Sequence, residues 1–135
     1  MQLSFTEKKN IRKSFGKLKE SLSIPNLIEV QKNSYKELTE LDLGSTEFKI
    51  PHMGWNELKI ANNSKVFKDV VDKNHAYFIH SYEFIPKDKK NVSITTNYGK
   101  DVIAAVSFEN IFGSQFHPEK SDKTGLVIIK NFLDL

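Results

Sequence analysis

Hydrophobic and polar positions divide the chain into a first part with helical spacing and a longer part with strand-like alternation. Over residues 26–41, NLIEVQKNSYKELTEL, apolar residues recur every three to four positions, and Pro25 suits the helical turn that opens this stretch. Ser4 and Glu7 have the spacing of a capping box ahead of a short basic stretch. Residues 1–40 are therefore predicted to form a helical leader.

Strand-like patterns begin at about Phe48. Residues 75–85, HAYFIHSYEFI, are rich in aromatic and β-branched side chains, and residues 92–98, VSITTNY, form a second such run. Two further runs, 101–108 and 110–116, are separated by a very short connection, which predicts a hairpin. This part of the chain is expected to be β-rich.

A closing helix is predicted at the carboxy end, in DKTGLVIIKNFLDL (122–135). Its apolar residues recur at helical spacing, and we expect four of them to form the buried stripe: Leu126, Ile129, Phe132 and Leu133.

The composition favours a single globular domain. The chain has 135 residues, of which 39% are hydrophobic and 27% charged, and both values are typical of folded proteins. No apolar run approaches the roughly 20 residues that span a membrane, and charges occupy the place of a signal-peptide core. The absence of cysteine excludes disulfides and thiolate metal sites. We expect a cytoplasmic protein with no cofactor. We also expect no metal site, because the four histidines lack the spacing of metal ligands: His52, His75, His80 and His117.

The net charge of +3 is unevenly distributed. Residues 1–40 hold eight basic and five acidic residues, whereas the basic and acidic residues of 41–135 are equal in number. Such an excess is typical of a nucleic-acid contact, but it is also typical of a solvated helix face. The solvated face is the simpler interpretation, and we expect no nucleic-acid binding.

The segment QFHPEKS (115–121) contains the residues with the clearest chemistry. His117 and Glu119 lie two positions apart after a strand, so their side chains can point to the same side. A carboxylate bonded to one ring nitrogen fixes the histidine tautomer and leaves the other nitrogen to accept a proton from a nucleophile. Pro118 restricts the backbone between them. The pair has the chemistry of a base with its orienting acid, although a plain surface turn is the alternative.

Four stretches in a fixed order extend this interpretation. They are KIPHMGWNEL (49–58), FIHSY (78–82), IFGSQFHPEKS (111–121) and GLVIIKNFL (125–133). Together they closely resemble the carboxy-terminal half of the class I glutamine amidotransferases, and most specifically the glutaminase subunit of imidazole glycerol phosphate synthase. The resemblance covers residues 48–135. It implies an α/β fold in which this chain holds an incomplete flavodoxin-like sheet, β-rich with a closing helix, after the helical leader.

The resemblance also implies roles for individual residues. His117 would be the base that activates a cysteine thiolate, with Glu119 as its acid, in the hydrolysis of glutamine to glutamate and ammonia. Ser81 and Tyr82 would line the wall that holds the glutamine. A further set would dock onto the barrel-shaped synthase (cyclase) subunit that receives the ammonia: His52, Met53, Gly54, Trp55, Asn56, Tyr77 and Lys120. The aromatic members of this set are alternatively plain core residues, and the lysine is alternatively a solvated charge.

The third member of such a triad is absent, since the chain has no cysteine. The glycine-rich oxyanion loop and the sharp turn that bears the nucleophile in the family correspond to nothing here, and no G-x-S-x-G turn offers a serine instead. Loss of a triad nucleophile costs about a million-fold in turnover in a well-studied hydrolase. We therefore expect a truncated amidotransferase that does not hydrolyse glutamine by itself.

The beginning of the chain resembles a different protein. SFTEKKNIRKSFGK (4–17) and IPNLIEVQKNSYKEL (24–38) are similar to the amino terminus of the bacterial RNA polymerase β subunit. We therefore divide the chain into a leader (1–40), a junction (41–47) and the amidotransferase segment (48–135). Three origins of such a chimera stay open: a gene fusion, a degenerate remnant, or an artefact of assembly or gene calling.

Two other functions compete with the glutaminase. One is a non-catalytic module that docks on the synthase subunit, and the other is a polymerase-associated protein that acts through residues 1–40. We also expect marginal stability or self-association, because the strands would lack the central strands with which they normally pair.

Overall fold

The computed structural model describes residues 35–44 and 47–135. These residues belong to one compact unit, Ser34–Leu135. The capping box expected at Ser4 and Glu7, and the leader before residue 35, lie outside the described residues.

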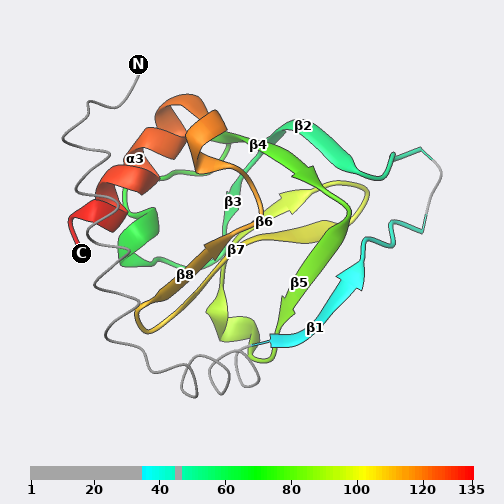
Figure 1. The fold of residues 1–135 in the computed structure, drawn as a ribbon, viewed down its shortest axis with the longest axis horizontal. Coiled ribbons are helices and arrows are strands. Elements are labelled where there is room, and N and C mark those ends of the chain that lie inside the picture. The colour runs from blue at the N-terminus through cyan, green and yellow to red at the C-terminus, as the bar shows by residue number, and fades with distance from the viewer. Residues whose placement is uncertain (1–34, 45–46) are drawn as a thin grey trace. The chain divides into compact units, whose positions relative to one another are not determined.

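The described chain is β-rich and ends in a helix. Its strands are β1 (Tyr35–Glu40), β2 (His52–Glu57), β3 (Lys59–Ile60), β4 (His75–His80), β5 (Tyr82–Pro86), β6 (Val92–Asn97), β7 (Asp101–Phe108) and β8 (Ile111–Ser114). Its helical elements are η1 (Lys65–Phe67), η2 (Lys89–Asn91), η3 (Pro118–Lys120) and α3 (Asp122–Leu133) (Figure 1). The strands pair antiparallel in three groups, β1–β5, β2–β4 and β3–β6–β7–β8. The expected β-rich texture, the hairpin and the closing helix are confirmed.

The segment Tyr35–Glu40 is a strand, so the helix predicted over residues 26–41 is wrong for these six residues. The strand pairs with β5, where Leu38 lies opposite Phe84 and Glu40 lies opposite Tyr82. A short amphipathic run has little helical stability of its own, and pairing with β5 satisfies its backbone groups. Tertiary pairing therefore overrides the local helical spacing. The division into leader, junction and amidotransferase segment stays a prediction. β1 belongs to the leader in that division, but it pairs with β5 of the amidotransferase segment.

The main core is a cluster of buried side chains that come from β4, β6, β7, α3 and the region of η1. Phe78 is fully buried at 0% exposure, and its ring meets that of Phe116 edge to face, with centroids 5.7 Å apart. Burial of one such side chain contributes about 1.5–3 kcal/mol. The cluster contains Leu58, Val66, Phe67, Val70, Ala76, Phe78, Ile94, Ala104, Ala105, Phe116 and Ile128.

The buried face of α3 differs from the predicted stripe. Gly125 and Ile128 are buried, whereas Leu126 and Leu133 are 41% and 42% exposed. The cause is steric, because a Cβ added at Gly125 would lie 1.7 Å from the carbonyl oxygen of Pro118. This backbone contact turns the glycine face inward, and the two leucines consequently point outward. The prediction is wrong for the leucines, while the other two residues of the stripe are half-buried.

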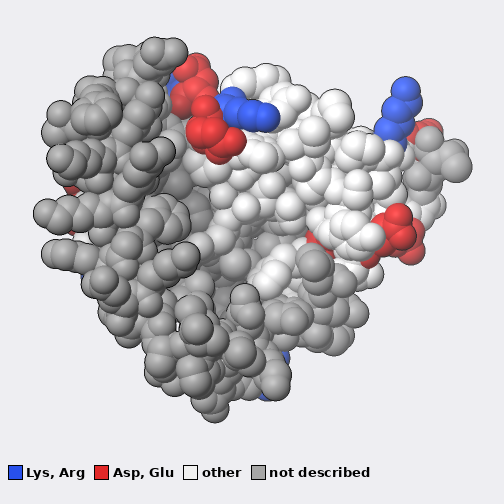
Figure 2. Space-filling model, viewed as in Figure 1, with Lys and Arg blue, Asp and Glu red and all other residues white. Residues whose placement is uncertain are grey.

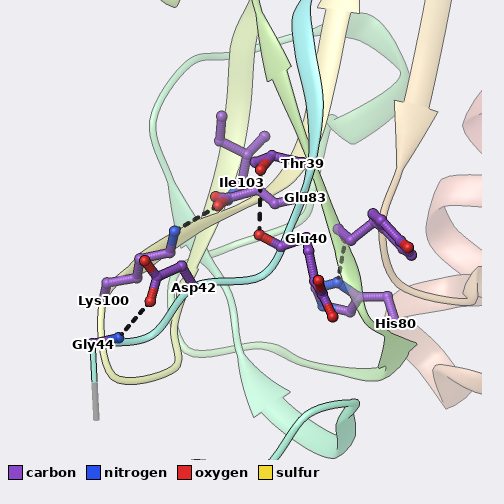
Figure 3. Close-up of polar contacts among 9 residues, drawn as sticks. Thr39, Glu40, Asp42, Gly44, His80, Glu83, Lys100 and Ile103 are labelled. Carbon is purple, nitrogen blue, oxygen red and sulfur yellow. Dashed lines mark hydrogen bonds and ion pairs between the residues drawn. The ribbon is translucent and has the colours of Figure 1, made fainter.

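A buried carboxylate ties β5 to β7. Glu83 is 4% exposed, pairs with Lys100 at 2.8 Å and accepts a hydrogen bond from the Ile103 amide at 3.2 Å (Figure 3). A buried charge is tolerated here because it is both paired and hydrogen-bonded. The contact holds β5, and with it the β1–β5 pair, against the four-stranded sheet.

We predict that Gly125→Ala lowers the free energy of unfolding by about 3 kcal/mol or more, because the new Cβ forces Pro118 away from α3. Gly113→Ala is the matched control, since its added Cβ would meet Val106 Cγ2 at 3.4 Å, an ordinary contact. Thermal unfolding followed by circular dichroism measures both variants. Equal melting temperatures would contradict the close approach of Gly125 to Pro118.

Candidate active site

His117 and Glu119 lie in the turn between β8 and α3 and are bonded to each other. His117 Nδ1 is 2.9 Å from Glu119 Oε1. Because an ionised carboxylate only accepts hydrogen bonds, the proton of the neutral ring sits on Nδ1 and Nε2 keeps its lone pair. Nε2 has no hydrogen-bond partner within the described part of the chain, and the side chain is 37% exposed. The pairing expected from the spacing is confirmed; the catalytic roles stay a prediction.

The surroundings of Glu119 keep its carboxyl ionised. Partial burial by itself would raise the pKa of this carboxyl, but three groups outweigh it and hold the pKa below its ordinary value. They are the backbone amide of Glu119 itself, the His117 ring and the Lys120 ammonium. The carboxylate is therefore charged at neutral pH and can stabilise a protonated imidazole.

The backbone around His117 is bonded to β4. The His117 amide donates to the Tyr77 carbonyl at 2.9 Å, and the Ser121 hydroxyl donates to the His117 carbonyl at 2.6 Å. Pro118 opens η3, where no amide proton is needed. Sequence reasoning missed Ser121 and Gly125. The available signal was a glycine in the first turn of a helix, which is disfavoured unless another backbone approaches closely.

Ser81 and Tyr82 lie at the other end of β4. Ser81 is half-buried between β4 and β5, and its carbonyl accepts a hydrogen bond from the Leu41 amide at 2.8 Å. Tyr82 is 54% exposed. Ser81 comes four positions after Tyr77, which along an extended chain is about 13 Å. Ser81 and Tyr82 therefore lie apart from Tyr77, where His117 contacts β4. Their role in binding glutamine stays a prediction.

Four of the seven residues expected at the partner interface share one exposed face of the β2–β4 pair. Met53 and Trp55 are 56% and 54% exposed, and Trp55 lies opposite Tyr77 in the strand register. The rings of Trp55 and Tyr77 meet edge to face at 5.9 Å, and Lys120 Nζ lies 5.9 Å from the Tyr77 centroid, which is a cation–π distance. Ile79, opposite Met53, adds a further exposed apolar side chain. We call these five residues the β2–β4 face.

The other three expected interface residues lie on the opposite side of β2, because side chains alternate along a strand. His52 is only 2% exposed and its ring stacks between those of Phe78, at 4.6 Å, and Tyr98, at 3.9 Å. Its burial places this side chain in the core rather than at the interface expected from the sequence. Asn56 is half-buried and donates to the Asn97 carbonyl at 2.8 Å. The third residue, a glycine, has no side chain to present.

His52 and His80 form a buried chain of hydrogen bonds with a single direction. His80 Nδ1 lies 2.9 Å from the Tyr82 carbonyl, which only accepts, so this nitrogen carries the proton. His80 Nε2 must then accept, and His52 Nδ1, 2.9 Å away, must donate to it. Burial lowers the pKa of His52 to about 4, with His80 adding to the effect, and burial also lowers the pKa of His80. Both rings are neutral at physiological pH.

Two features are absent from the described residues. No group of three or more histidine, cysteine, aspartate or glutamate side chains within them could hold a metal ion. Nor is any helix among them long and apolar enough to cross a membrane. Most of the described surface visible in Figure 2 is uncharged, and the few basic side chains visible on it lie apart from one another.

A family model settles where this fold belongs. The model "Glutamine amidotransferase class-I" matches residues 9–135. The chain belongs to the class I glutamine amidotransferase family. The described residues accordingly have the class I fold in part, β-rich with partial sheets and a carboxy-terminal helix. The match begins within residues 1–40, and the resemblance of that segment to RNA polymerase β stays a prediction.

Curated relatives of this chain are subunits of imidazole glycerol phosphate synthase. Imidazole glycerol phosphate synthase subunit HisH from Pelagibacter ubique is 54% identical over 98 residues, which are 73% of this chain and 47% of the relative. Subunit HisH 2 from Methanococcus maripaludis is 47% identical over 89 residues, 66% of this chain and 44% of the relative. The chain thus spans about half the length of these curated relatives.

A solved structure supports the fold alone. It is a Thermoplasma acidophilum protein described as a GMP synthase subunit, with a TM-score of 0.59 and 16% identity. The similarity covers 79% of this chain and 50% of that protein.

We predict that acid destabilises the protein through the buried histidines. Because the fold lowers their pKa values, the unfolded chain binds more protons, and stability falls as the pH drops from about 6.5 towards 4. His52 alone accounts for a loss on the order of 3 kcal/mol over this range. His52→Gln should flatten the pH dependence of urea unfolding more than His75→Gln, at a histidine whose side chain is 54% exposed. An unaltered pH dependence in His52→Gln would overturn this assignment.

Proposed function

We propose that this chain supplies the base and the orienting acid of a glutaminase that serves imidazole glycerol phosphate synthase in histidine biosynthesis. The observation that carries the proposal is the His117–Glu119 pair, with Nδ1 held at 2.9 Å by the carboxylate and Nε2 left to accept a proton. The relatives named imidazole glycerol phosphate synthase subunits support the substrate and the pathway. The cytoplasm is the proposed compartment.

The proposed reaction requires a cysteine that this sequence does not contain. Glutamine hydrolysis of this type begins with attack of a thiolate on the side-chain amide, and His117 would take the thiol proton through Nε2 and pass it to the leaving ammonia. Glu119 would stabilise the imidazolium that forms in between. The 135-residue chain on its own is therefore proposed to be inactive, with the nucleophile supplied by a segment outside it.

We predict that the 135-residue chain alone releases no ammonia from glutamine. A graft of residues 48–135 onto the unmatched half of the Pelagibacter ubique relative should be active beside its synthase subunit. In that graft His117→Ala should lower kcat by about 10³-fold or more, because the thiol loses its base. Lys87→Ala is the control, since Lys87 is an exposed residue after β5 and belongs neither to the site nor to the strands β2 and β4. A graft that keeps its activity in His117→Ala would exclude the proposed role.

The β2–β4 face is proposed as the docking surface for the synthase subunit. Met53, Trp55 and Ile79 are 40–56% exposed, and aromatic and methionine side chains are enriched at protein interfaces. Tyr77 and Lys120 extend the face towards the turn that holds His117. Docking there does not depend on the cysteine, so a non-catalytic docking module is the second candidate function.

We predict that Trp55→Ala weakens binding to the synthase subunit by about tenfold to a hundredfold, since interface tryptophans often dominate the binding energy. Val71→Ala is the control, because Val71 is an apolar residue that is 58% exposed but lies outside the face. Titration calorimetry with the purified synthase subunit measures both affinities. Equal losses in the two variants would place the interface elsewhere.

A further inference from the structure

The His117–Glu119 pair needs a support that the pair itself does not provide. The two side chains are 37% and 59% exposed, and ion pairs exposed to this degree do little to hold a geometry. A general base nevertheless has to keep one tautomer and one direction in order to reach its nucleophile. Another residue must therefore hold the turn in place.

Ser121 is the buried polar residue directly behind this turn. It is 1% exposed, and its hydroxyl makes two hydrogen bonds: it donates to the His117 carbonyl at 2.6 Å and accepts from the Tyr77 amide at 3.0 Å. The His117 amide donates to the Tyr77 carbonyl at 2.9 Å. These three bonds form a closed ring that joins the turn to β4. Both hydrogen-bonding functions of the hydroxyl are used.

The backbone of Ser121 also fixes the turn to α3. Its amide donates to the Pro118 carbonyl at 3.1 Å, and its own carbonyl accepts from the Gly125 amide at 3.0 Å. The next residue, Asp122, has a left-handed φ of 46°, which non-glycine residues seldom adopt. The chain therefore bends sharply at Ser121, between the turn on one side and the helix on the other.

We propose that Ser121 is the positioning residue of the His117–Glu119 pair, and that its hydroxyl fixes the tautomer and direction of His117. The inference rests on the proposed role of His117 as the base. Removal of the hydroxyl leaves the Tyr77 amide without its partner, while the His117 carbonyl keeps the bond from the Lys120 amide at 3.0 Å. A buried amide without a partner drives local rearrangement. Such a rearrangement moves the His117 backbone, and with it the imidazole ring, relative to Glu119.

The test compares Ser121→Ala with Ser93→Ala in the full chain. Ser93 is the matched control, because it is 0% exposed and its hydroxyl lies 2.7 Å from that of Ser107, away from the turn. The readout is the pair of imidazole ¹⁵N chemical shifts of His117, recorded by NMR at a pH where the ring is neutral. We expect one tautomer, protonated on Nδ1, in the parent chain and in Ser93→Ala. In Ser121→Ala we expect this single state to be lost in favour of comparable populations of both tautomers.

Ser121→Thr, which keeps the hydroxyl, should restore the single tautomer. A Ser121→Ala chain that keeps the Nδ1 tautomer of the parent would overturn the proposal, and so would a loss of similar size in Ser93→Ala. If Ser121→Ala does not fold, hydrogen exchange in the parent decides: the Tyr77 amide should exchange at least about 100-fold more slowly than a free amide, and free exchange would refute the bond. The readout requires no glutamine turnover, so failure of the proposed glutaminase is detected separately.

Discussion

The site depends on how the backbone of Tyr77 is used. Its carbonyl and its amide both bond to the segment that carries His117, one directly and one through the Ser121 hydroxyl. Its side chain contacts Trp55 and Lys120. One residue of β4 thus connects the exposed β2–β4 face to the turn with the imidazole. The buried neighbours of Tyr77 in β4 anchor this arrangement in the core, because alternate residues of a strand face opposite sides.

Much of this fold could be predicted from patterns along the sequence. The strand character of 75–85 and 92–98, the hairpin and the extent of α3 follow from periodicity, because buried and exposed positions repeat at the spacing of each element. The single run expected over 75–85 is nevertheless two strands, since the chain breaks at Ser81 and β4 and β5 pair with different partners. The contact of His117 with Glu119 follows from their spacing across a proline. These features are local, since each depends on residues only a few positions apart.

The features that could not be predicted arise between distant segments. Tyr35–Glu40 becomes a strand because β5 lies beside it, and the inward face of α3 is selected by the contact of Gly125 with a carbonyl rather than by hydrophobicity. His52 is buried although its neighbour Met53 is exposed, which the alternation of a strand explains once β2 is known. Ser121 looks like an ordinary polar residue after a turn until the partners of its hydroxyl are identified.

The one-way chain of hydrogen bonds through His52 and His80 has a consequence for how this protein can evolve. Each ring has its tautomer set by the next group, ending at a carbonyl that cannot donate. A substitution at either position leaves the other with a buried donor or acceptor that nothing satisfies, which costs about 1–3 kcal/mol. Selection therefore acts on the two positions as a single unit. A lineage that abandons one histidine is expected to change the other soon afterwards, so the two positions should covary.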